Sequence, residues 1–167
     1  MQTPQAIRVS PAFEQEWPEA SASATEVVIN LVRVGDALTS RVDALCRAHG
    51  LPSATAMIVL EVLRGADEPL QPSTVAERCF LSRPALSSVM ETLERRGYLS
   101  RSMHTTDRRR VQVAITDGGL AVMERLLPVL HRAEAEWIAP LSPSARKRLL
   151  AVLAEVQEQL GNGGTTR

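Results

Sequence analysis

Arginine side chains are the groups in this sequence whose placement could do chemistry. The 167 residues carry equal numbers of basic and acidic side chains, so the formal net charge is zero. Residues 78–110 nevertheless carry eight Arg against three acidic residues, and Arg108, Arg109 and Arg110 are consecutive. Guanidinium groups pair with phosphate oxygens, and attraction to a polyanion depends on the local field. This basic segment indicates either a nucleic-acid contact or a set of solvated surface charges.

Residue types that serve enzymes, metals or redox reactions form no comparable pattern. The sequence has no Gly-rich phosphate loop, no Ser/His/acid arrangement and no paired carboxylates beside a His, so we expect neither enzyme activity nor a cofactor. Cys46 and His49 are the one His/Cys pair at helical spacing, and two ligands fall short of a zinc site, so we expect no metal site. Cys46 is followed by Arg47, but a buried and inert Cys46 is favoured over a peroxide-sensing one, and Cys79 is interpreted in the same way.

Two helices joined by a tight turn are predicted to position the basic segment. Gln71-Pro72 is typical of a helix start and predicts a short helix over Pro72–Cys79. Ser82-Arg83-Pro84 then starts a second helix about three residues later, and Gly97 ends it. This spacing is typical of a helix-turn-helix, although any helical hairpin could share it.

Two short strands are predicted to follow the second helix. Tyr98–Met103 and Val111–Ile115 are rich in strand-forming residues, and the stretch between them is too polar to bury. A basic hairpin after a helix-turn-helix is a wing, whose consecutive Arg side chains suit phosphates and a minor groove.

Amphipathic helices are expected on both sides of this unit. Ser10-Pro11 predicts a short helix with Phe13 and Trp17 on one face, and Ser53 starts another helix. A capping box at Ser23–Glu26 opens a long helix that Gly50 closes. Its apolar stripe is Val27, Leu31, Val34, Leu38, Val42 and Leu45.

Two further helices are expected after the strands. Thr116-Asp117 opens a helix with a kink at Pro128 and the stripe Leu120, Met123, Leu127 and Leu130. Ser142-Pro143 opens the last helix. These stripes exceed what a unit of about 60 residues can cover, which predicts a homodimer interface built from both ends of the chain.

We therefore predict a mainly α protein with a small two-stranded β wing, in which a winged helix-turn-helix core is flanked by long dimerisation helices. The expected boundaries are 1–22 for an arm with a short helix, 23–50 and 117–160 for the dimerisation region, 51–116 for the DNA-binding domain, and 161–167 for a disordered tail. No signal pattern or long apolar run occurs, and Arg outnumbers Lys 18 to 1. We expect a bacterial, cytoplasmic protein associated with the nucleoid and with no membrane partner.

Several motifs together resemble the MarR-type (multiple-antibiotic-resistance regulator) winged-helix repressors over residues 25–160. The motifs are Leu51-Pro52-Ser53, Val75-Ala76-Glu77, Leu81–Ser87, Leu93–Arg101, Asp107–Arg110 and Ile115–Gly119. The resemblance implies a DNA-binding transcriptional regulator, expected to be a repressor, which binds a pseudo-palindromic operator as a homodimer and is released by a small effector. A redox-sensing regulator acting through Cys46 and a helical protein-interaction module are the alternatives.

Particular DNA contacts are implied by the same resemblance. Ser82–Glu91 would be the exposed half of the recognition helix in the major groove, and Arg109 would enter the minor groove with Asp107 orienting a basic neighbour. The implied contact set is Ser73, Thr74, Ser82, Arg83, Pro84, Ala85, Ser87, Ser88, Arg101, Thr105, Asp107, Arg108, Arg109 and Arg110. Many members have a basic residue where this chain has Ser88, so its recognition helix has few groups that could read bases. Arg83, Ser87 and Ser88 are therefore the residues expected to read them.

An effector pocket is expected between the dimer helices and the winged unit. Its predicted lining is Trp17, Arg41, Cys46, Met57 and Leu60. The walls are mostly apolar with nearby Arg side chains, which favours a small aromatic or lipophilic acid. Urate is not expected, because the region aligned with the acidic pocket residue of urate-binding members reads Ala54-Thr55-Ala56-Met57-Ile58.

Overall fold

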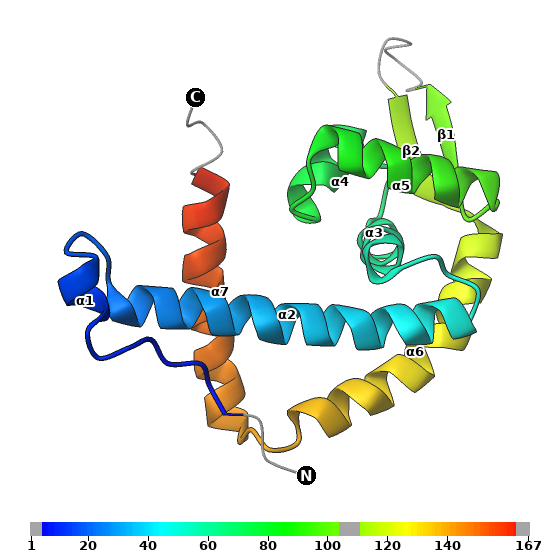
Figure 1. Ribbon diagram of the computed structural model, residues 1–167. Helices are drawn as coiled ribbons and strands as arrows, with labels where there is room; N and C mark the ends of the chain where they lie inside the picture. The colour runs from blue at the N-terminus through cyan, green and yellow to red at the C-terminus, as the bar shows by residue number, and fades with distance from the viewer. Residues whose placement is uncertain (1–4, 104–110, 163–167) are drawn as a thin grey trace. The chain divides into compact units, whose positions relative to one another are not determined.

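The computed structural model describes residues 5–103 and 111–162, which form seven α-helices and two strands (Figure 1). The elements are α1 (Phe13–Glu16), α2 (Ala22–Ala48), α3 (Ala54–Arg64), α4 (Pro72–Arg78), α5 (Arg83–Arg95), β1 (Leu99–Met103), β2 (Val111–Ile115), α6 (Asp117–Ile138) and α7 (Pro143–Asn162). They confirm a mainly α fold with a two-stranded antiparallel sheet. The chain divides into two compact units, one up to Ala44 and one from Leu45 onward.

An N-terminal arm is attached to α2 in the first unit. The amide N–H of Ile7 donates to Asn30 Oδ1 and Asn30 Nδ2 donates to the Ile7 carbonyl, both at 2.9 Å. Glu26 accepts from the Val9 amide at 3.0 Å and pairs with Arg8 at 2.6 Å. The hydrogen bonds from Arg8 and Val9 hold the pKa of Glu26 below its usual value. Side chains of α2 therefore fix a segment that lies outside any regular element.

Two helix starts in the first unit differ from the sequence predictions. Helix α1 begins at Phe13 rather than at Pro11, because the Ser10 hydroxyl accepts from the Ala12 amide and so stabilises a turn before the helix. Helix α2 begins at Ala22, and the Ser21 hydroxyl accepts from the Ala24 amide at 3.3 Å. The predicted capping box at Ser23–Glu26 does not form, because the Glu26 carboxylate accepts hydrogen bonds from Arg8 and the Val9 amide of the arm instead.

The core of the second unit is built from aliphatic side chains of α3 to α6 and the strands. Its largest fully buried members are Leu51, Val59, Leu60, Val75, Leu86, Leu93, Val113, Val122, Met123, Leu126 and Leu130. In α6 the buried stripe includes Val122 and Leu126, whereas the sequence analysis named Leu120 and Leu127, which are half-buried. Pro128 lies inside the helix, which continues for ten residues beyond it, and the kink predicted there stays a prediction.

Large apolar side chains remain exposed on α2 and on α7. They are Val27, Val28, Val32 and Val34 on α2, and Leu149, Leu150, Val152 and Leu160 on α7. Of the predicted stripe of α2, Val27 and Val34 are exposed and the other four residues are half-buried, and Cys46 is the fully buried residue of that helix. None of the described helices is long and apolar enough to cross a bilayer.

The last helix is capped as the sequence predicts. The Ser142 hydroxyl accepts from the Ala145 amide at 3.2 Å, and α7 reaches Asn162, two residues beyond the predicted boundary. Arg146 donates to the carbonyls of Leu141 and Ile138, which stabilises the turn between α6 and α7.

Candidate nucleic-acid interface

The first helix of the candidate helix-turn-helix is α4. Pro72 occupies its first turn, as predicted, and Val75 and Ala76 face the core. Ser73 is exposed and Thr74 is half-buried at the start of the helix, where backbone N–H groups have no intrahelical acceptor. Both residues predicted to donate to phosphates therefore lie at an end of α4 that favours anions.

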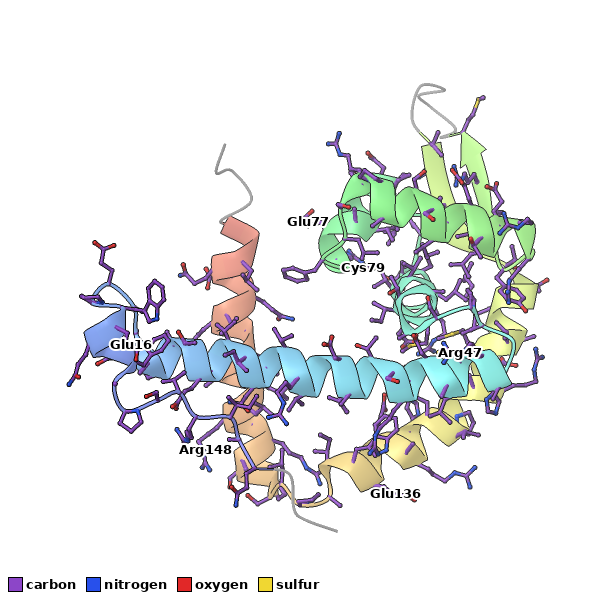
Figure 2. All side chains as sticks on the ribbon, viewed as in Figure 1. Glu16, Arg47, Glu77, Cys79, Glu136 and Arg148 are labelled. Atoms are coloured by element: carbon purple, nitrogen blue, oxygen red, sulfur yellow. The ribbon has the colours of Figure 1, made fainter. Side chains whose placement is uncertain are left out.

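The turn between α4 and α5 is a C-terminal helix cap with an unusual residue. The Phe80 amide donates to the Glu77 carbonyl and the Leu81 amide to the Ala76 carbonyl, at 3.2 and 2.9 Å, which is the Schellman pattern. Phe80 adopts φ +53°, in the left-handed region, and its side chain is 60% exposed. Glu77 and Cys79 mark this end of α4 in Figure 2. The tight turn was predicted from the sequence, but its left-handed residue was not.

Helix α5 has one buried face and one open face. The Ser82 hydroxyl caps it by accepting from the Ala85 amide at 3.3 Å, and Leu86, Met90 and Leu93 are buried. Residues on the opposite side at helical spacing are Pro84, Ser88, Glu91 and Arg95. The predicted contact residues Arg83, Pro84, Ala85 and Ser88 are exposed, whereas Ser87 is half-buried. The residues predicted to read bases thus lie in the N-terminal half of α5, where Arg83 and Ser88 are exposed and Ser87 is half-buried.

Polar side chains of α5 also bond to one another. The Ser87 hydroxyl donates to Glu91 Oε1 at 3.4 Å, and the Thr92 hydroxyl donates to the Ser88 carbonyl at 3.1 Å. Arg95 Nη2 donates to the Thr92 hydroxyl at 3.4 Å. These contacts restrict the rotamers of Ser87 and Thr92. From the sequence, Glu91 was named only as the end of the range Ser82–Glu91, and no contact was predicted for it.

The wing is an antiparallel hairpin joined to the loop before α4. Its register pairs Leu99 with Ile115 and Met103 with Val111. Leu70 and Val113 exchange both backbone hydrogen bonds, at 2.9 and 2.8 Å. The predicted contacts Thr105, Asp107, Arg108, Arg109 and Arg110 lie outside the described residues, so these remain predictions from the sequence.

An ion pair joins the wing to α5. Arg101 Nε lies 3.0 Å from Glu94 Oε2, and both side chains are partly exposed. Arg101 was predicted to contact the DNA backbone, and its remaining N–H groups are the ones that could do so. The ion pair also fixes β1 against α5, so Arg101 positions the wing in addition to any phosphate contact.

The junction between the wing and α6 explains the spacing of Thr116 and Gly119 in the Ile115–Gly119 motif. The Thr116 hydroxyl accepts from the Gly119 amide at 3.1 Å and donates to the Gly97 carbonyl at 2.6 Å. It therefore caps α6 and holds the end of the preceding helix. A Cβ on Gly119 would overlap the Tyr98 carbonyl oxygen, so the backbones of this junction approach too closely for any side chain.

The predicted effector-pocket residues are divided between the two units. Trp17, exposed at the end of α1, and the exposed Arg41 belong to the first unit. Cys46 and Leu60 are fully buried in the second unit and Met57 is half-buried there. The pocket stays a prediction.

Both cysteines are poorly placed for redox chemistry. A peroxide-sensing thiol must be accessible to solvent, and Cys46 has no exposed surface. Burial raises the pKa of the Cys79 thiol and so disfavours its reactive thiolate. Among the residues that the structure describes, no group of three or more His, Cys, Asp or Glu side chains is arranged to hold a metal ion.

Comparison with known proteins points to one family. Residues 49–110, which contain α3, α4, α5 and β1, match the MarR family. Over this part the chain is similar to that family. It is 28% identical over 152 residues to the HTH-type transcriptional regulator PecS of Dickeya dadantii, a match that covers 90% of this chain and 91% of PecS. Identity to the HTH-type regulator YwaE of Bacillus subtilis is 36% over 91 residues, but this match spans 54% of the chain and only 53% of YwaE.

Solved structures of the family share the fold. The regulator PcaV of Streptomyces coelicolor, determined with its natural ligand, superposes with a TM-score of 0.70 at 27% identity, over 83% of this chain and 96% of PcaV. Sco3205 of the same organism, a MarR family regulator determined with DNA, gives a TM-score of 0.77 at 22% identity over 84% of this chain and 89% of that one. The chain therefore shares the fold of MarR family structures, and the curated relatives that it resembles are transcriptional regulators of the helix-turn-helix type.

Proposed function

We propose that this chain is a homodimeric repressor that binds a pseudo-palindromic operator through α5 and the wing and is released by a small aromatic or lipophilic acid. The open face of α5 is the observation that carries this proposal. It presents Arg83 and small side chains around a capped helix start, with its apolar face buried. A helix of this kind fits a major groove, where Arg reads guanine.

A second copy of the chain is the partner that the apolar faces of α2 and α7 suit. Each of these helices exposes several Val or Leu side chains that nothing in the described chain covers. A symmetric dimer buries the same faces of both copies at once. It also provides two recognition helices for half-sites about 34 Å apart, the length of one helical turn of DNA.

Binding measurements on selected duplexes test the DNA-binding part. Sequences would be selected from a random duplex library, and affinities measured by fluorescence anisotropy for the selected operator and for random DNA. We expect Arg83→Ala to weaken operator binding by about 1–3 kcal/mol and to relax preference at one or two base pairs. Arg125→Ala, an exposed arginine on α6, is the matched control and should leave base preference unchanged. Equal losses on operator and random DNA with Arg83→Ala would contradict the assignment of α5 as the reading helix.

Titration with phenolic acids tests the effector. The ligand-bound structure of PcaV supports a small-molecule effector for this chain as well. A ligand that releases DNA must bind more weakly to the DNA-bound protein than to the free one. We therefore expect salicylate-like acids to show a lower affinity when the operator is present. Equal affinities of the acid with and without the operator would exclude release by this route. It would also be excluded if no such acid binds and a metal or peroxide releases the DNA instead.

A further inference from the structure

A carboxylate lies on the face of α5 that is expected to meet DNA. Glu91 is exposed and lies on the side of the helix opposite the buried Leu86, Met90 and Leu93. Within α5, which the structure describes throughout, the other carboxylate belongs to Glu94, which pairs with Arg101 of the wing. Glu91 instead accepts a hydrogen bond from Ser87 at 3.4 Å. A negative charge at this position is unfavourable beside phosphates, so we expect a hydrogen-bond donor on the DNA to compensate for it.

Base edges in the major groove differ in how they receive a carboxylate. An ionised carboxylate only accepts hydrogen bonds. Guanine presents two acceptors there and would repel it, and adenine presents an acceptor beside its donor. Cytosine presents its N4 amino group, which donates, and Glu is a side chain that accepts from that group. Cytosine is therefore the base that an acidic side chain on this face matches.

The position of Glu91 along the helix suits a contact next to the one expected for Ser88. Three residues of α-helix rise about 4.5 Å against about 3.4 Å between adjacent base pairs, so side chains at this spacing can reach neighbouring pairs when the helix is inclined to the DNA axis. The hydrogen bond from Ser87 goes to Oε1 of Glu91, so Oε2 is the atom that we expect to accept from the base. Ser87 thereby reduces the rotamer freedom that Glu91 would lose on binding.

We infer that Glu91 is a specificity-determining residue that accepts a hydrogen bond from the N4 amino group of one cytosine in each half-site, with Ser87 orienting its carboxylate. This inference rests on the proposed function, because it requires α5 to enter the major groove. It adds an acidic side chain, which reads one base pair of each half-site, to the Arg and Ser side chains that are expected to read the operator.

A change of base preference is the decisive measurement. Duplexes would be selected from a random library with the wild-type protein, with Glu91→Gln and with Glu91→Ala. Gln both donates and accepts and matches adenine. We expect Glu91→Gln to change one position of each half-site from a C·G to an A·T pair, and Glu91→Ala to lose preference there. Glu77→Gln, which removes the same charge from the exposed surface of α4, is the matched control and should select the wild-type sequence.

A modified base tests the same hydrogen bond without changing the protein. N4-methylcytosine replaces the N–H that points into the major groove by a methyl group. Placed at the identified position of each half-site, it should weaken wild-type binding on the order of tenfold and leave Glu91→Ala binding unchanged. If Glu91→Gln selects the wild-type sequence and binds operator and random DNA more tightly by the same factor, Glu91 acts through charge alone and the inference is overturned. If the wild-type protein selects no sequence at all, the proposed function fails together with the inference.

Discussion

Phe80 occupies a backbone position that two other helix ends of the second unit give to glycine. In the described residues, α2, α4 and α5 each end in the same pair of hydrogen bonds, and the left-handed residues are Gly50, Phe80 and Gly97. A residue with a Cβ is about 1–2 kcal/mol less stable than glycine in that region. The helix-turn-helix turn therefore contains local strain that the other two caps do not have.

Two substitutions at this residue separate the strain from the loss of the ring. Phe80→Gly and Phe80→Ala both remove the phenyl group, but only glycine relieves the left-handed conformation. We expect Phe80→Gly to be more stable than Phe80→Ala by about 1 kcal/mol, even though glycine loses more entropy on folding. Urea denaturation followed by circular dichroism measures the difference. Equal stabilities would show that φ +53° at this position costs nothing.

Residue type explains which of these positions could be predicted from the sequence. Gly50 and Gly97 were predicted as helix ends because glycine itself is the signal for a left-handed cap. Phe gives no such signal, so the conformation of Phe80 could not be predicted. The ion pair between Glu94 and Arg101 depends on how the wing packs against α5, which no local pattern reveals.

At the scale of elements, the junction between the wing and α6 depends on one glycine. A Cβ on Gly119 would overlap the Tyr98 carbonyl oxygen and lie 2.7 Å from Ile115 Cγ1. We expect Gly119→Ala to destabilise the protein by about 3 kcal/mol, because the strand and the helix start must move apart. A Cβ on Gly35, in the middle of α2, would have no heavy atom within 4 Å, so Gly35→Ala should instead stabilise by about 0.5–1 kcal/mol. Thermal unfolding of both variants checks the opposite signs.

The attachment of the N-terminal arm to α2 should depend on pH. Arg8 and the Val9 amide stabilise ionised Glu26 and lower its pKa from the usual 4.5, so the attachment is complete near neutral pH. It weakens as the pH falls through the lowered pKa. We expect the Val9 amide resonance to titrate below pH 4.5, and Arg8→Ala to move this inflection upward. An inflection that Arg8→Ala leaves in place would contradict the role of the ion pair.

Helix starts show how far local sequence patterns extend. Ser53, Ser82, Thr116 and Ser142 were predicted as caps, and each accepts a hydrogen bond from an amide three residues later. The predicted capping box at Ser23 failed because its acidic member, Glu26, binds a segment far from it in sequence. Local patterns could predict caps whose partners are local, but not a side chain recruited by a distant segment.

At the scale of the whole molecule, oligomeric state is the property that the apolar helix faces determine. Leu150 on α7 is 68% exposed, and a carboxylate in its place would be buried against apolar groups in a dimer. We expect Leu150→Glu to shift the protein to a monomer in multi-angle light scattering and to lose tight operator binding. Ala151→Glu adds the same charge at an exposed position about 100° round the helix from Leu150 and serves as the matched control. A Leu150→Glu protein that remains a dimer would exclude this face from the interface.

The bridge between Leu70 and Val113 has a consequence for how the DNA-binding unit opens. Its two hydrogen bonds close a loop of chain that contains α4, α5 and β1. Because both bonds must break before the wing base or the start of α4 can separate, these segments form one cooperative unit of local unfolding. The amides of Leu70 and Val113 should therefore exchange with deuterium at a common rate. We expect the wing base and the start of α4 to move together in any rearrangement of this unit, with both hydrogen bonds kept.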